Sequence, residues 1–324
     1  MLNHVLAIVA FSQVKTTGPI YTQSLTTASG IVQMQTLAQQ LVREGKPDIW
    51  LVGAVHIGSK QYYTSLQTLL DSQEVVLFEG VKTAARKDAP ASKVDEKVKP
   101  KEDPAIKPIY KALSDALGLE FQLNMINYNH PNWKNVDMTW EELDKMNKDP
   151  KGNDKPGTFS QVKQLLDPKS PQAKMFTSML DTATPGMKEA IKLMIVKSVA
   201  SGEVVLDSDT ENIIVKARNK VVVASLAASI SSAKLPKSIA VFYGAKHFAD
   251  METTLVMNYG YKLGKQQWFT AADADPSKVD ATGKMLLDAL EKQKKSGGVS
   301  SGGKLLAQLP QPNRPEMYPW VSGF

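Results

Sequence analysis

The strongest constraint on the fold is a short segment in which two apolar strands flank one helix. Residues 48–56, with the sequence DIWLVGAVH, form a continuous apolar run typical of a strand buried on both faces. Residues 59–72 have apolar side chains at helical spacing, and residues 74–79, EVVLFE, form a second short apolar run. A strand, a helix and a strand within about thirty residues predict a βαβ unit with parallel strands.

The rest of the sequence predicts a single α/β fold around this unit. The apolar periodicity of residues 108–205 is mainly helical, and a helix follows the N-capping residues 207–210. We therefore expect a central, mostly parallel or mixed sheet covered by helices, with a helical insertion between the second and third core strands. Further helices are expected at residues 29–45, 208–231 and 248–259, and further strands at residues 238–243 and 265–270.

Composition along the chain predicts one domain with less regular ends. Residues 29–285 form the predicted domain, and residues 82–107, rich in Lys, Pro, Ala and acidic residues, are an expected mobile linker or insertion. Residues 286–324 are an expected low-complexity tail. The N-terminal segment, residues 1–28, is compatible with a first strand or with the remnant of a secretion signal. Secreted, periplasmic and cytoplasmic locations therefore all stay open.

Composition also excludes several classes of function. The chain has no cysteine, so any metal must be held by His, Asp or Glu. The net charge of +6, from 39 basic and 33 acidic residues, is spread along the chain, and we expect no nucleic-acid partner. No run approaches the ~20 apolar residues of a membrane helix. Nucleophile-elbow, P-loop and dinucleotide-binding motifs are absent from the sequence. Nothing in the sequence indicates an oligomeric state.

Three side chains that can carry chemistry follow the predicted strands. His56 ends the sequence Gly-Ala-Val-His, Glu79 ends the second strand, and His247 ends a second Gly-x-x-His sequence after the third strand. Because ligands bind beyond the carboxyl ends of parallel strands, the βαβ unit places His56 and Glu79 at one edge, and a parallel third strand adds His247. Two imidazoles and a carboxylate are the ligands of many catalytic zinc and manganese centres. On spacing alone, hydrogen-bonded structural histidines and a helix-capping glutamate fit equally well.

These motifs resemble those of a known family. Residues 51–58 (LVGAVHIG) with Tyr63 and residues 76–79 (VLFE), and residues 241–247 (VFYGAKH), resemble the two Gly-x-x-His blocks of the TraB/GumN family. That family is similar to the TIKI metalloproteases and, more distantly, to ChaN-like haem-binding lipoproteins and erythromycin esterases. The resemblance covers residues 48–270 except the 82–107 stretch.

The resemblance implies a metal-dependent hydrolase, a peptidase in the TIKI case, that acts on a peptide or small-molecule substrate. A divalent Mn, Co or Zn ion would be held by His56, Glu79 and His247, with Glu79 either a ligand or the general base.

Two further residues are candidate catalytic groups. Arg218, with Asn219, resembles the family's Arg-Asn pair before the second block, and it would orient substrate or stabilise an oxyanion. The position before this pair is Ala217, where the family often has Glu, and a structural arginine is the alternative. His130 precedes a segment, residues 136–142, that resembles another family block, and it is a candidate to reach the site from the helical insertion. Asp137 in that segment could approach the site too, although packing at a helix start, before a capping box of Thr139 and Glu142, suits it better.

A non-catalytic function is the alternative hypothesis. The ChaN-like relatives suggest a protein that sequesters haem or a peptide in the same cleft. Haem binding would require an axial ligand, for which Tyr62, Tyr63 and Tyr243 are the possible donors.

Overall fold

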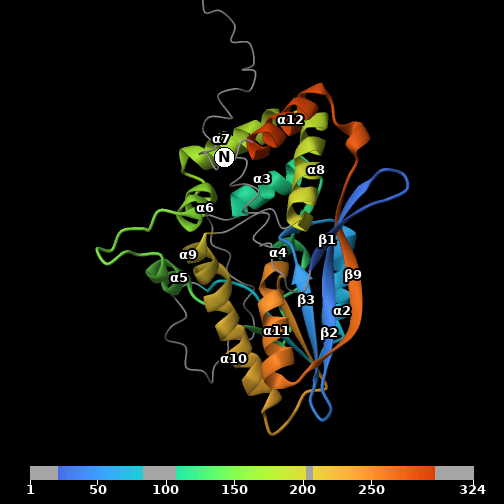
Figure 1. Cartoon of the computed structure of the whole chain (residues 1–324), viewed down its shortest axis with the longest axis vertical. Helices are drawn as coiled ribbons and strands as arrows, with labels where there is room; N and C mark the ends of the chain where they lie inside the picture. Colours follow the sequence, from blue (N-terminus) through green and yellow to red (C-terminus); the bar gives the residue numbers. More distant parts are fainter. Residues whose placement is uncertain (1–20, 83–106, 202–206, 296–324) are drawn as a thin grey trace, which may run out of the picture.

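The computed structural model of the chain describes residues 21–82, 107–201 and 207–295 and arranges them around one seven-stranded sheet (Figure 1). The strand order is β1-β2-β3-β8-β5-β7. Strand β9 lies off this path and pairs with β2 along its whole length, whereas β1 and β3 pair with different halves of β2. The strands are β1 (Thr22–Thr26), β2 (Val32–Val42), β3 (Asp48–Ala54), β5 (Val75–Phe78), β7 (Trp133–Asn135), β8 (Ser238–Gly244) and β9 (Lys262–Ala274). A separate pair joins β4 (Ile57–Gly58) to β6 (Glu120–Phe121).

The centre of the sheet is parallel and its β1, β2 and β9 side is antiparallel. Strand β8 pairs in parallel with β3 on one side and β5 on the other, and β5 pairs in parallel with β7. The expected βαβ unit is therefore confirmed, although its two strands are separated by β8, which is contributed by a distant part of the chain. The expected mixed α/β class is confirmed as well.

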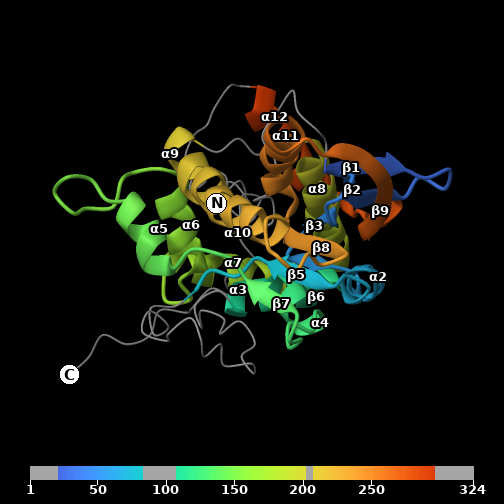
Figure 2. The same ribbon diagram turned by 90° about the horizontal axis from the view of Figure 1, so that it is seen from below.

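Helices cover both faces of this sheet (Figures 1 and 2). Alternate residues of β8 point to opposite faces: Ala240 and Phe242 belong to one hydrophobic core, and Val241 and Tyr243 belong to the other. The first core also contains residues of α2 (Lys60–Asp71), α3 (Lys107–Leu117), α7 (Pro171–Thr182), α8 (Pro185–Ser201) and α12 (Ala281–Lys295). The second contains residues of α10 (Arg218–Ile230) and α11 (Phe248–Tyr259).

The helix expected at residues 29–45 is wrong, because this segment is the long strand β2. Its apolar residues are spaced three and four apart, as on one face of a helix, but they serve two faces of a strand. Met34 and Ala38 belong to the first core, whereas Leu37 and Leu41 belong to the second. A strand that is covered on both faces does not show simple alternation, so its apolar residues can follow the spacing expected of a helix.

The helical insertion between β5 and β8 is confirmed. Besides α3, α7 and α8 it contains α4 (Gln122–Met125), α5 (Trp140–Met146) and α6 (Thr158–Leu166). It also contributes the short edge strand β7. Thr139 and Glu142 form the expected capping box of α5.

The segment after the insertion begins with the expected N-cap, since the Asp207 side chain accepts a hydrogen bond from the Thr210 amide. It continues through α9 (Ser208–Glu211) and the π-helix η2 (Asn212–Ala217) into α10.

The ends of the predicted domain can be compared only in part. Helix α12 runs to Lys295, with Leu286 and Leu290 buried, so packed structure extends beyond residue 285. A short 3-10 helix, η4 (Pro276–Lys278), precedes it. The expected mobile stretch and the tail beyond α12 lie outside the described residues, as does the chain before residue 21. Among the described residues no helix is both long and apolar enough to cross a membrane.

Candidate functional site

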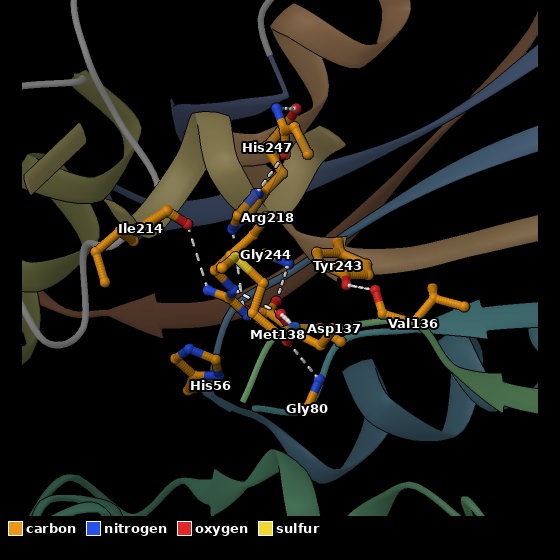
Figure 3. Close-up of polar contacts among 12 residues, drawn as sticks. His56, Gly80, Val136, Asp137, Met138, Ile214, Arg218, Tyr243, Gly244 and His247 are labelled. Atoms are coloured by element: carbon orange, nitrogen blue, oxygen red, sulfur yellow. Dashed lines mark hydrogen bonds and ion pairs between the residues drawn. The ribbon is translucent and has the colours of Figure 1, made fainter. Parts of the chain in front are cut away.

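The parallel strands bring Glu79 and His247 together at one edge of the sheet. Figure 3 shows His56 and His247 on either side of Arg218 at this edge. Glu79 follows β5, and its backbone N–H donates to the Phe242 carbonyl of β8. His247 ends the 3-10 turn η3 (Ala245–His247) after β8, and its Nε2 lies 3.9 Å from Glu79 Oε1. His56 follows β3, near enough for the Glu79 charge to act on its ring. Segments far apart in the sequence thus meet at the carboxyl ends of three neighbouring strands.

The centre of the site is a guanidinium held between two carboxylates. Arg218 Nη2 donates to Glu79 Oε1 at 2.6 Å and to Asp137 Oδ2 at 2.6 Å, and Arg218 Nε donates to Asp137 Oδ1 at 2.9 Å (Figure 3). The Arg218 side chain is 6% exposed and that of Asp137 is fully buried. Buried charges persist only when they are paired and hydrogen-bonded, and these three satisfy one another.

Backbone amides complete the bonding of both carboxylates. Asp137 accepts from the amides of Gly80 and Met138, at 2.9 and 2.8 Å. Glu79 Oε2 accepts from the amide of Gly244 at 2.6 Å. A Cβ at position 244 would lie 3.3 Å from that oxygen, so glycine gives the carboxylate close access to the backbone.

A π-helical turn delivers Arg218 to this position. In η2 the consecutive residues Ile213, Ile214 and Val215 are all buried, and the carbonyl of Ile214 accepts a bond from Arg218 Nη1 at 3.4 Å. The wider turn shifts the register so that Arg218 and Asn219 both point inward, with 5% and 2% exposure. Single π turns inside helices are common at functional sites.

His247 is buried and firmly oriented. Its Nδ1 lies 2.7 Å from Asn219 Oδ1, and the Tyr243 ring contacts its edge at a centroid distance of 5.2 Å. Burial lowers the pKa of the imidazole to about 4, against the opposing influence of the Glu79 carboxylate. His247 is therefore neutral at neutral pH.

His56 is half-buried in a similar setting. Its Nδ1 lies 3.3 Å from Gln122 Oε1, and the Tyr110 ring meets it edge-on at 5.4 Å. Burial lowers its pKa as well, and the Glu79 charge and the Gln122 hydrogen bond offset part of the effect. Both histidines thus favour the neutral form.

Glu79 is the permanent charge among the three candidate residues. Burial alone would raise the pKa of its carboxyl, but Arg218 above all, with the Gly244 amide and with the nearby histidines once acid protonates them, brings it down to about 2. A carboxylate of such low pKa has little affinity for protons at neutral pH. The role of general base considered for Glu79 therefore fits poorly, and the role of a fixed anion fits well.

The structure does not bring His130 to this site. His130 precedes β7 at the amino end of the parallel strands, where it stacks on Trp133 and its Nε2 lies 3.6 Å from Asp71 Oδ1. Asp71 is the last residue of α2, on the opposite side of the sheet from the carboxyl edge. His130 therefore lies outside the candidate site.

The hydroxyl groups of the three tyrosines considered as haem ligands form hydrogen bonds within the protein. The Tyr63 hydroxyl donates to the Val55 carbonyl, and the Tyr243 hydroxyl donates to the Val136 carbonyl. The Tyr62 hydroxyl bonds to Thr36 and to the Gly53 carbonyl. All three side chains are buried, so in this arrangement none offers an oxygen to haem iron.

Sequence reasoning missed one residue of the site and undervalued two. Gln122 lies 66 residues from His56 on the short helix α4, and no motif marks it. Asn219 was noted only as part of the Arg-Asn pair. Asp137 was assigned to helix-start packing, although its buried bidentate pairing with Arg218 makes it central to the site.

The donor set of the site fits a divalent metal by its chemistry. Neutral imidazoles and an ionised carboxylate are the forms that bind Zn²⁺, Mn²⁺ or Co²⁺, and the Glu79 oxygens keep lone pairs beyond those used by Arg218 and Gly244. In the present arrangement, however, the described part of the chain contains no group of three or more His, Asp or Glu able to hold an ion. Metal binding by these residues would therefore require their side chains to move closer together.

Comparisons with known proteins give no relative for this chain. No family model matches it, and neither the search of curated proteins nor that of solved structures finds a match. The resemblance to the TraB/GumN family stays a prediction, and any function must be argued from the geometry.

Replacing Asp137 by Asn should destabilise the protein strongly. The amide would keep the shape but remove the charge that compensates buried Arg218, and breaking a buried ion pair costs about 3–5 kcal/mol. Asp71→Asn is the matched control, because its exposed pairing with His130 is worth at most about 1 kcal/mol. Urea unfolding measures both variants, and equal losses in the two would contradict a central role for Asp137.

Glu79 should also make the stability of the protein fall in acid. Its pKa falls from 4.5 to about 2 on folding, so the contribution is present above pH 4.5 and is lost as the pH falls towards 2. Between pH 5 and pH 3 the wild type should lose roughly 2 kcal/mol that Glu79→Gln does not lose. Urea unfolding across this range tests the difference, with exposed Glu44→Gln as control. Parallel pH curves for wild type and Glu79→Gln would show that Glu79 is not held ionised by Arg218.

Proposed function

We propose that the protein is a metal-dependent hydrolase that cleaves peptide or related carbonyl bonds at this edge of the sheet. The observation that carries the proposal is the meeting of two neutral histidines with a permanently ionised carboxylate beyond three parallel strands. Groups of this kind at the carboxyl ends of strands are typical of active sites in α/β proteins.

Both histidines would act through Nε2 in this proposal, as metal ligands or, where no ion is bound to that nitrogen, as proton carriers. In each ring Nδ1 faces an amide oxygen, which leaves Nε2 as the nitrogen that can accept a proton from water or bind an ion. His247 Nε2 is 3.9 Å from Glu79 Oε1, so a proton gained by His247 would be stabilised by that carboxylate.

Within the group formed by Arg218, Glu79 and Asp137 the charges favour a cation. Arg218 carries one positive charge and pairs with two carboxylates, Glu79 and Asp137, which leaves a formal excess of one negative charge. His56 and His247, with Glu79, would hold a divalent ion there. Such an ion, when bound, supplies a water of lowered pKa that is nucleophilic at neutral pH.

Arg218 has a supporting role in this proposal. Its guanidinium already donates to Asp137, Glu79 and the Ile214 carbonyl, so it holds the Glu79 carboxylate in place rather than binding substrate. This differs from the substrate-orienting role expected from the sequence. Sequestration of a peptide without cleavage is the remaining alternative, and product analysis separates it from hydrolysis.

Hydrolysis should depend on the three residues of this edge. The purified protein is incubated with a quenched-fluorescent peptide library and Mn²⁺, Co²⁺ or Zn²⁺, and products are identified by mass spectrometry. His56→Ala and His247→Ala should each lower kcat/KM by about 10²–10⁴-fold, the range for loss of a positioned acid–base group. Glu79→Gln should lower it as well, because the fixed negative charge of the site is lost. His130→Ala, at the opposite edge, should keep wild-type activity. Binding of peptides without cleavage, or full activity in the two site-histidine variants, would exclude the proposal.

Metal binding should be visible without any substrate. A ligand that binds only the folded state adds about 2.7 kcal/mol of stability at one hundred times its Kd, so Mn²⁺, Co²⁺ or Zn²⁺ should raise Tm. The shift should disappear in His56→Ala and persist in His130→Ala, which removes a histidine elsewhere. Identical melting curves with and without millimolar concentrations of all three ions would exclude a metal site.

A further inference from the structure

Each of the two site histidines is paired with a carboxamide from a different part of the fold. Asn219, on α10, faces His247, and Gln122, on α4, faces His56. We propose that Asn219 and Gln122 are positioning residues that hold both histidines in the tautomer with the proton on Nδ1, so that Nε2 is the basic nitrogen of each ring. The catalytic consequence of this arrangement rests on the function proposed above, whereas the tautomer itself does not.

The hydrogen bonds of Asn219 determine which nitrogen of His247 carries the proton. Asn219 Nδ2 donates to the His247 carbonyl at 3.1 Å and to Asp250 Oδ2 at 3.0 Å. A carbonyl and a carboxylate only accept, so the NH₂ group must face them and Oδ1 must face the ring. Because Oδ1 has no proton to donate, the 2.7 Å contact with His247 Nδ1 requires Nδ1–H.

Gln122 repeats this arrangement at His56. Gln122 Nε2 donates to the Tyr128 hydroxyl at 2.9 Å, and Oε1 lies 3.3 Å from His56 Nδ1. A tyrosine hydroxyl can donate as well as accept, so the Asn219 pair carries the assignment and the Gln122 pair is the second case to test. Gln122 is 6% exposed and Tyr128 is 5% exposed, so water competes little with these bonds. An Nδ1–H tautomer satisfies both partners.

Each amide residue also binds the backbone of its histidine. Asn219 Nδ2 donates to the His247 carbonyl, and the Gln122 backbone N–H donates to the His56 carbonyl at 2.9 Å. The ring and the main chain of each histidine are therefore fixed by the same neighbour. Two unrelated elements, α10 and α4, thus provide the same kind of support to two different histidines.

The choice of an amide rather than a carboxylate has a chemical consequence. A carboxylate facing Nδ1 would also accept a hydrogen bond from Nδ1–H, but its negative charge would favour the imidazolium form of the ring. An amide oxygen fixes the tautomer without adding charge, and the lone pair of Nε2 stays available to a proton or an ion. Asn219 and Gln122 therefore suit rings that must act through Nε2 while neutral.

Nitrogen-15 NMR of the full-length protein reads the tautomer directly. With only four histidines in the chain, uniform histidine labelling gives few signals, and single substitutions at each position assign them. Long-range proton–nitrogen spectra distinguish protonated from unprotonated ring nitrogens. In the wild type, His247 and His56 should both show a protonated Nδ1 and an unprotonated Nε2. A protonated Nε2 on either ring in the resting protein would overturn the proposal for that pair.

Variants separate positioning from simple loss of packing. Asn219→Leu removes the acceptor, so His247 should populate the Nε2–H tautomer, and hydrolysis or metal affinity should fall about 10–100-fold, as for other partners of functional histidines. Asn219→Asp keeps an oxygen for Nδ1–H and should keep that nitrogen protonated. Gln122→Leu and Gln122→Glu form the same pair for His56, and they test the idea if Asn219 variants do not fold.

Asn147→Leu is the matched control for the loss of a buried amide. Asn147 caps the C-terminus of α5, away from both histidines, and is 3% exposed. Its side-chain amide donates a hydrogen bond to the Ser160 hydroxyl of α6. Its replacement should cost stability while leaving both tautomers and activity unchanged. If Asn219→Leu leaves the His247 tautomer and activity unchanged, Asn219 is merely structural. An Nδ1–H tautomer in a protein that hydrolyses nothing would support the positioning role and count against the proposed function alone.

Discussion

The pairing of Arg218 with Asp137 and Glu79 is the interaction on which the rest of the site depends. It joins three elements that are distant in sequence: the end of β5, the loop before α5, and the start of α10. None of these charges could be buried alone, because the desolvation of an unpaired ion is prohibitive. Together they fix an ionised carboxylate beside His247, and the neutral state of both histidines follows from the same burial. The Arg218 guanidinium thus joins distant parts of the fold and also keeps the Glu79 carboxylate of the candidate site ionised.

The sequence was sufficient to predict the parallel centre of the sheet and the edge where the candidate residues lie. The apolar runs before His56, Glu79 and His247 are strands of the fully buried kind, and parallel strands present their carboxyl ends together. Strand β2 was mistaken for a helix because Met34 and Leu37 serve opposite faces of the sheet. Burial on both faces removes the alternation by which a strand is usually recognised.

The partners of the site could not be predicted because they depend on tertiary contacts. Gln122 reaches His56 from a one-turn helix, and Asp137 reaches Arg218 across 81 residues. The π turn that points Arg218 inward has no sequence signature, since Ile213 and Ile214 would suit an α-helix equally well. The prediction that His130 reaches the site rested on its position in the sequence alone. Its proximity to a motif in sequence says nothing about which end of a strand it occupies.

The position of β8 has a consequence for the order in which the molecule is assembled. This strand is made late, yet it lies between β3 and β5, which are made early. Until residues 238–244 leave the ribosome, β3 and β5 have facing edges with unpaired amides and carbonyls, a situation that invites aggregation. The same strand delivers the Gly244 amide and, in the following turn, His247. A growing chain therefore gains its central strand and the last residues of the candidate site in one event.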